Sequence, residues 1–167
     1  MAERQGRTAP DAVLTRIGQV VMLHHAGDRE EARHRLLDLW AEIGEHGDPL
    51  HRCTLAHYLA DTQDDPADEL AWDLRALTAA EEAGEDTGEE ARAVIAFYPS
   101  LHLNLADDYL GLGRFDAART HLRWAREAAA ALADDRYGEG VRAAIARLQA
   151  RLGEGGGGAW TPPRQRP

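Results

Sequence analysis

Hydrophobic residues recur every three or four positions along most of the chain, with charged and small polar residues between them. This spacing places the apolar side chains on one face of an α-helix, and no segment shows the alternation typical of a strand. The pattern predicts seven helices. In order, they run from about residue 10 to 25, from 28 to 43, from 49, from 66 to the acidic stretch 81–86, from 87 to 112, from about 116 to 133, and through 141–152.

Several predicted helices begin with recognisable start signals. Asp48-Pro49 and Asp65-Pro66 each place an acid that can accept hydrogen bonds before a proline suited to the first helical turn. Asp28 is followed three residues later by Glu31, and Thr87-Gly88-Glu89-Glu90 has the spacing of a capping box. These signals predict where the polar breaks between helices lie.

Pro99 falls inside the fifth apolar stretch, where it can either bend one long helix or start a new one. Leu101, Leu105 and Tyr109 continue the stripe beyond it. We therefore expect a bent but nearly continuous helix that reaches Leu112.

One helix-turn-helix pattern occurs three times along the chain. Each copy has a large residue, a turn residue, an alanine and two further apolar positions at nearly the same spacings. The copies are Leu23, Gly27, Ala32, Leu36 and Leu39; Tyr58, Thr62, Ala67, Ala71 and Leu74; and Tyr109, Gly113, Ala118, Leu122 and Ala125. Such units bury their apolar stripes against neighbouring copies.

The third copy, from Leu105-Ala106 through Tyr109 and Gly113 to Ala125, resembles a tetratricopeptide repeat. The resemblance extends over roughly residues 13–150. It departs at His102, where the family often has Trp, and at Ala130, where it often has Pro. The alanines of the first two copies are 35 residues apart, but those of the second and third are 51 apart, with the excess between 81 and 99.

The resemblance implies an all-α, right-handed superhelical array of about three helix-turn-helix repeats with a C-terminal capping helix. We expect a flexible N-terminal tail over residues 1–9, a repeat domain over 10–152 and a disordered Gly/Pro-rich tail over 153–167. Trp160 and the following proline-rich basic residues could dock on a partner or fold back onto an acidic groove, although an untethered terminus is the simpler interpretation.

The 167-residue chain has a formal net charge of −10, which argues against a protein that tracks nucleic-acid phosphates. All 19 basic residues are Arg, so Schiff-base chemistry and a P-loop lysine are excluded. This bias, with abundant Ala, Gly and Asp, resembles actinobacterial proteins.

A single cysteine, Cys53, rules out an intrachain disulfide. The first eleven residues lack the apolar core of a signal peptide, and no run is long enough to span a membrane. We expect a cytoplasmic protein without a membrane partner.

In tetratricopeptide-repeat proteins the first helix of each repeat lines a concave groove. The resemblance places these residues in that groove: Ile17, Val21, His24, Arg52, Cys53, Ala56, Leu103, Asn104, Asp107 and Leu110. The Lys and Asn clamp by which some members grip a C-terminal carboxylate is essentially absent, because Ile17, Val21, Cys53, Ser100 and Asn104 occupy its positions. A mixed groove of this kind suits a helix or extended segment with apolar anchors.

Candidate sites for chemistry are weaker. One predicted helix carries His51, Cys53 and His57. Cys53 and His57 have the i, i+4 spacing at which two side chains of a helix can bind the same metal ion, but no compact ligand motif accompanies them. We expect no metal, no cofactor and no catalytic residue. The aspartates at 61, 64, 65, 107 and 108 are expected to cap helices or lie on polar faces.

The sequence therefore favours a non-catalytic adaptor or scaffold that binds a peptide or helix of a protein partner. The alternative is a homo-oligomeric regulatory or accessory protein, for instance a homodimer. A metal-binding or enzymatic protein that uses the His and Cys residues is the third interpretation.

Overall fold

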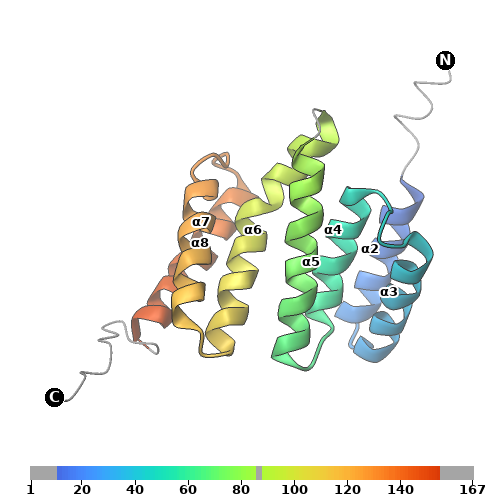
Figure 1. The fold of residues 1–167 in the computed structure, drawn as a ribbon, viewed down its shortest axis with the longest axis horizontal. Helices are drawn as coiled ribbons and strands as arrows, with labels where there is room; N and C mark the ends of the chain where they lie inside the picture. The colour runs from blue at the N-terminus through green and yellow to red at the C-terminus, as the bar shows by residue number, and fades with distance from the viewer. Residues whose placement is uncertain (1–10, 86–87, 155–167) are drawn as a thin grey trace. The chain divides into compact units, whose positions relative to one another are not determined.

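The computed structural model of the protein describes residues 11–85 and 88–154 (Figure 1). Within these ranges the chain forms helices and turns without a strand, which confirms the predicted all-α repeat fold. The helices are α2 (Ala12–His25), α3 (Arg29–Ile43), α4 (Pro49–Asp61), α5 (Pro66–Gly84), α6 (Glu89–Gly111), α7 (Phe115–Ala129) and α8 (Arg136–Glu154).

The helices group into two compact units, which we describe separately. Unit 1 ends at Ala83, in the last turn of α5, and unit 2 begins at Gly84. Each unit has an apolar core formed by the predicted stripes. The core of unit 1 comprises Ile17, Val20, Ala32, Leu36, Leu39, Leu55 and Leu59, and that of unit 2 comprises Ala106, Ala118, Leu122, Ala125, Ala129, Val141, Ile145, Leu148 and Leu152.

Aspartate caps start three of the helices in unit 1. Oδ1 of Asp48 accepts the Leu50 N–H at 2.8 Å, and Oδ1 of Asp65 accepts the Ala67 N–H at 2.8 Å, as the sequence predicts. Asp11 caps α2 in the same way. The prediction for Asp28 is wrong, because its side chain caps no N–H of α3. Thr87 of the predicted capping box lies outside the described residues, as do the N-terminal tail up to residue 10 and residues 155–167.

Helix α6 continues through Pro99, which confirms the prediction of one bent helix. Figure 1 shows that α6 changes direction near the middle of its length, where proline cannot donate the helical hydrogen bond. Helix α5 extends to Gly84, further into the acidic stretch than expected. Helix α8 begins at Arg136, ahead of the expected loop end at Gly138.

The turns α2–α3 and α6–α7 are built alike. Each has three residues with a glycine in the middle, at φ 99° for Gly27 and φ 75° for Gly113. In the second turn the N–H of Arg114 reaches back to the carbonyl of Tyr109 at 2.8 Å, a bond typical of a glycine-terminated helix. Glycine is suited to these positions because a Cβ would be strained at positive φ.

The α4–α5 turn is different, because it has four residues, 62–65, and no glycine. Thr62 is fully buried, and its hydroxyl donates to the carbonyl of Leu59 at 2.7 Å. The side-chain amide of Gln63 donates to the same carbonyl at 3.0 Å. These side-chain bonds add to the backbone bonds at the end of α4, where the Thr62 N–H donates to the Leu59 carbonyl and the Gln63 N–H donates to the Ala60 carbonyl.

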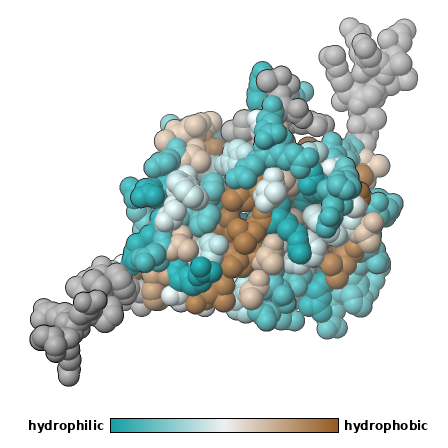
Figure 2. All heavy atoms as spheres, viewed as in Figure 1, coloured by the Kyte–Doolittle hydropathy of each residue, from teal (hydrophilic) through white to brown (hydrophobic). Residues whose placement is uncertain are grey.

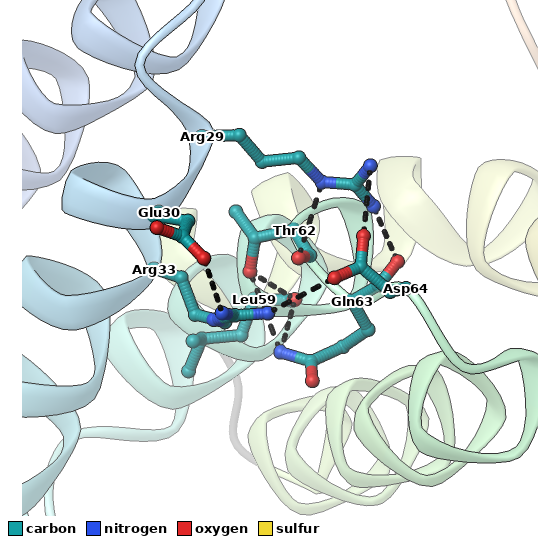
Figure 3. Close-up of polar contacts among 7 residues, drawn as sticks. All are labelled: Arg29, Glu30, Arg33, Leu59, Thr62, Gln63 and Asp64. Atoms are coloured by element: carbon teal, nitrogen blue, oxygen red, sulfur yellow. Dashed lines mark hydrogen bonds and ion pairs between the residues drawn. The ribbon is translucent and has the colours of Figure 1, made fainter.

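Two arginines from the start of α3 complete this turn (Figure 3). Arg29 donates from Nε to the Thr62 carbonyl at 3.2 Å and also bonds the Gln63 carbonyl. Its Nη1 lies 3.2 Å from Oδ1 of Asp64, and Nη1 of Arg33 lies 3.5 Å from Oδ2 of the same carboxylate. The turn is thus held by a neighbouring helix, and we call these contacts the arginine clamp.

The extra turn residue shifts the register of the second repeat. Ala32 and Ala118 are fully buried, as predicted for the position where two helices cross, but Ala67 is exposed. Leu74, expected in the core, is 38% exposed, and Leu70 and Ala76 are buried instead. Of the landmark residues of the second copy, Ala67 and Leu74 were therefore wrong, whereas Thr62 lies in the turn as predicted and the helix pair is present.

Among the described residues, no helix has both the length and the apolar character that crossing a membrane requires.

Candidate functional site

Helix α2 carries two apolar faces. Ile17 and Val20 are buried in the core of unit 1, and Val13 and His24 extend the same inward face. A second stripe follows the spacing i, i+4, i+7, i+8, i+11 on another side of the helix. It consists of Leu14, Gly18, Val21, Met22 and His25, and we call it the α2 stripe.

The α2 stripe is open to a neighbour along its length. Leu14 and Val21 are half-buried at the margin of the core, and Met22 is 72% exposed. A Cβ at Gly18 would meet no other atom within 4 Å, so this position leaves a shallow gap between larger side chains. An apolar side chain of another molecule could approach the helix backbone there.

The start of α4 is fixed beside the start of α2. Nε2 of His51 lies 2.6 Å from Oδ2 of Asp11, and this hydrogen bond is the main cause that lowers the pKa of the Asp11 carboxyl. The two first helices of the repeats in unit 1 therefore lie side by side, as Figure 1 also shows.

The ten residues predicted to line a groove differ in accessibility. Ile17, Arg52, Cys53 and Ala56 are buried; Val21, His24, Leu103, Asn104 and Leu110 are half-buried; and Asp107 is exposed. In unit 1, of the predicted residues, only Val21 and His24 thus present appreciable side-chain surface. The half-buried or exposed positions on α4 are instead Pro49, Leu50, His51, Thr54, His57, Tyr58 and Asp61.

In unit 2, helix α8 packs on the predicted face of α6. Leu103 and Leu110 pack against the core cluster that includes residues of α8, and Nη1 of Arg151 lies 2.7 Å from Oδ1 of Asp107. Part of the surface assigned to a partner is therefore used within the chain. A charge placed at Leu103 would disturb the fold as well as any binding.

The cluster of His51, Cys53 and His57 does not form a three-ligand group within the described part of the chain. Cys53 is buried, and desolvation raises the pKa of its thiol to about 12. Burial also lowers the pKa of His57, while the nearby carboxylate of Asp61 acts in the opposite direction. His51 is engaged by Asp11, so the three side chains have separate environments.

The aspartates that could suggest catalysis mostly have structural roles. Asp65 caps α5, Asp64 pairs with the arginine clamp, and Asp107 pairs with Arg151. Asp108 corrects the expectation of a solvated position, because it is 6% exposed. Its sequence neighbour Asp107 is exposed, so the helix places these two acids in different surroundings.

A cleft of about 280 Å³ in unit 1 was not predicted. Its lining comprises Trp40, Glu45, Arg52, Leu74, Arg75 and Thr78. The rings of Trp40 and Trp72 meet edge to face at 5.1 Å between centroids, and the guanidinium of Arg75 lies 4.3 Å from the Trp72 ring centre. Arg52 is held there by the Gly47 carbonyl at 2.8 Å and by Glu82 at 2.6 Å.

This cleft could accept a carboxylate beside an apolar group, because guanidinium and indole groups line it together. Little in the sequence indicates this cleft, because Trp40 and Trp72 lie on different helices and only the fold brings them together.

Figure 2 shows that hydrophilic residues cover much of one face of the molecule, with hydrophobic residues exposed between them. Among the large hydrophobic residues that are exposed in the described ranges, Met22 has the highest accessible fraction.

Comparison with known proteins identifies the repeat. A family model described as a tetratricopeptide repeat matches residues 13–36, which span α2 after its first residue and the first half of α3, and residues 99–124, which span α6 from Pro99 onward and the first two thirds of α7. Both stretches include a three-residue glycine turn. No curated protein and no solved structure matches the chain.

Proposed function

Because the chain is a tetratricopeptide-repeat protein, we propose that it is a non-catalytic adaptor or scaffold that binds a peptide or helix of a protein partner. Repeats of this type generally mediate protein–protein interaction. The proposed binding surface is the face of unit 1 lined by the first helices of its repeats, α2 and α4, with the α2 stripe as its anchor.

The observation that carries this proposal is the exposure of Met22 beside the half-buried Leu14 and Val21. Isolated exposed apolar residues are common, but Met22 continues an apolar stripe that Leu14 and Val21 begin at the margin of the core, and contiguous apolar surface of this kind marks interaction sites. The gap at Gly18 supports a partner side chain that inserts close to the helix axis.

The partner segment we propose is an amphipathic helix or extended peptide with apolar anchors and basic flanking residues. Methionine supports such binding because its flexible thioether adapts to differently shaped side chains. The net charge of −10 favours basic residues around the anchors, since complementary charge speeds association and selects the partner.

The non-catalytic part of the proposal rests on how the polar side chains are used. Asp64 and Asp65 stabilise the α4–α5 turn, and the thiol of Cys53 is protonated at neutral pH. These groups have the environments of structural residues.

A photo-crosslinking amino acid at position 22 tests the surface directly. The full chain carrying it would be incubated with native cell lysate and irradiated, and the crosslinked protein identified by mass spectrometry. The matched control carries the same group in place of Leu37 on α3, which is 38% exposed. We expect a specific protein crosslinked from position 22 and not from position 37.

The same partner should be lost from a pull-down with Met22→Glu and retained with Leu37→Glu. Neither change places a charge in the core, because both residues are exposed. Retention by Met22→Glu would contradict the α2 stripe as the anchor. Crosslinks only between copies of this chain, together with a dimer mass in light scattering, would favour the homo-oligomer instead.

A further inference from the structure

Two histidines meet between α6 and α7 in unit 2. Nδ1 of His102 lies 3.1 Å from Nδ1 of His121, and the ring centroids are 5.4 Å apart. Because the nitrogens are much closer than the centroids, the rings approach each other through their Nδ1 edges. Both side chains are half-buried, so solvent reaches the pair.

Aromatic side chains hold the two rings in place. Trp124 meets His102 at 5.4 Å and His121 at 5.1 Å between ring centroids, edge to face in both contacts. Tyr98 lies nearly parallel to His102, and Tyr109 lies nearly parallel to His121. The imidazoles are thus positioned from several sides, which reduces the ordering cost of binding a ligand.

The short contact limits the hydrogens between the rings. Two neutral imidazoles can share one Nδ1–H, so one ring donates and the other accepts with its lone pair. If the donating ring carried its hydrogen on Nε2 instead, the Nδ1 lone pairs of the two rings would face each other and repel. A cation between the two nitrogens would then be needed to keep them this close.

The separation of the nitrogens suits such a cation. Two nitrogens that are each about 2.0–2.1 Å from one ion lie about 2.9 Å apart at a right angle and about 3.3 Å apart at the tetrahedral angle. The observed 3.1 Å lies between these values. To bind the ion, each ring turns about its Cβ–Cγ bond until both lone pairs point to one position beside the line that joins the nitrogens.

We propose that His102 and His121 form a two-histidine site for a divalent transition-metal ion of the Cu²⁺, Ni²⁺ or Zn²⁺ class. On binding, the ring that now donates holds its proton on Nε2 instead of Nδ1, so two neutral rings bind the ion without releasing a proton. Water or a side chain of a partner completes the coordination. Imidazole suits these three ions, and Cu²⁺ should bind most tightly.

The protonation state also supports the site. Burial lowers the pKa of His102 to about 4, with a further contribution from His121, and burial lowers the pKa of His121 as well. Neutral imidazole is the form that binds a metal, so at neutral pH the pair loses no net proton when the ion binds.

Calorimetric titration of the full chain with Cu²⁺ tests the proposal. We expect one site whose affinity falls at least about tenfold in His102→Gln and in His121→Gln, because even outer-shell partners of metal sites contribute about 10- to 100-fold. His46→Gln is the matched control, since His46 is an exposed histidine in unit 1, and it should leave the affinity unchanged.

A measurement on the wild-type chain avoids dependence on how the variants fold. Cu²⁺ is paramagnetic, so one equivalent should broaden the NMR signal of the Trp124 indole N–H before those of Trp40 and Trp72 in unit 1. Circular dichroism would check the helical content of both variants. Unchanged affinity in the two variants, or broadening that begins at other histidines, would overturn the proposal.

Discussion

Nε of Arg29, in the first turn of α3, donates a hydrogen bond to the carbonyl oxygen of Thr62, 3.2 Å away at the end of α4. A side chain of the first repeat thereby donates a hydrogen bond to a carbonyl group at the end of the first helix of the second repeat. The second repeat has no turn glycine, and its residues lie outside the stretches that match the family model.

Replacing Arg29 with Met should destabilise the protein by about 1.5 kcal/mol, the lower part of the range for hydrogen bonds from a charged group, because the side chain is partly exposed. Chemical denaturation followed by circular dichroism would measure this loss. Arg35→Met is the control, since its exposed pair with Glu31 is worth about 0.2–0.5 kcal/mol. Equal losses in the two variants would mean that the clamp adds no more than a surface ion pair.

The register of the second repeat predicts opposite results for two alanines. Ala118→Leu should cost about 1–3 kcal/mol, because Ala118 is fully buried where α6 and α7 pack closely. Ala67→Leu should change the free energy of unfolding by less than about 0.5 kcal/mol, because Ala67 is exposed. A comparable loss at Ala67 would show that it occupies a buried crossing position after all.

Cys53 should react slowly with Ellman's reagent while the protein is folded. Its thiol is buried, and its pKa is raised to about 12, so little thiolate is present at mildly alkaline pH. The reaction rate should rise to that of a free thiol when denaturant unfolds the chain. In an Ala67→Cys variant the added, exposed thiol should react at once, and an equally fast reaction of Cys53 would contradict its burial.

His57 should make the protein less stable as the pH falls below about 6.5. Desolvation lowers its pKa in the folded state from the ordinary value of 6.5, despite the opposing carboxylate of Asp61. The unfolded chain therefore takes up this proton first, and protonation favours unfolding between about 6.5 and the folded pKa.

Denaturation curves between about pH 7 and pH 5 would measure this effect. His57→Gln should lose less stability over that interval than the wild type does. His46→Gln, at an exposed position, should lose as much as the wild type. If His57→Gln follows the wild-type curve, burial of His57 is not a source of the acid sensitivity.

Much of the fold could be predicted because local chemistry dictates it. Asp48-Pro49 and Asp65-Pro66 fix two helix starts, and Gly27 and Gly113 provide positive φ where turns require it. The register of the second repeat could not be read in this way. It depends on side-chain bonds around Thr62 and on Arg29, 33 residues earlier in the chain.

The accessible surface was harder to predict than the helices. Val21 was assigned to an accessible face, and it is half-buried on the α2 stripe, but Ile17, Arg52 and Cys53, assigned to the same face, are buried. The contact between His102 and His121 joins residues 19 positions apart on two helices, and no local spacing indicates it.

The arginine clamp also sets an order of events in folding. Glycine readily adopts the positive φ that the turns at Gly27 and Gly113 require. The pairs α2–α3 and α6–α7 can therefore each form as a local helical hairpin. The α4–α5 turn obtains two of its donors from Arg29, so it closes fully only after α3 has docked. Within unit 1 the second helix pair is thus built on the first, and the two should open together as one cooperative segment.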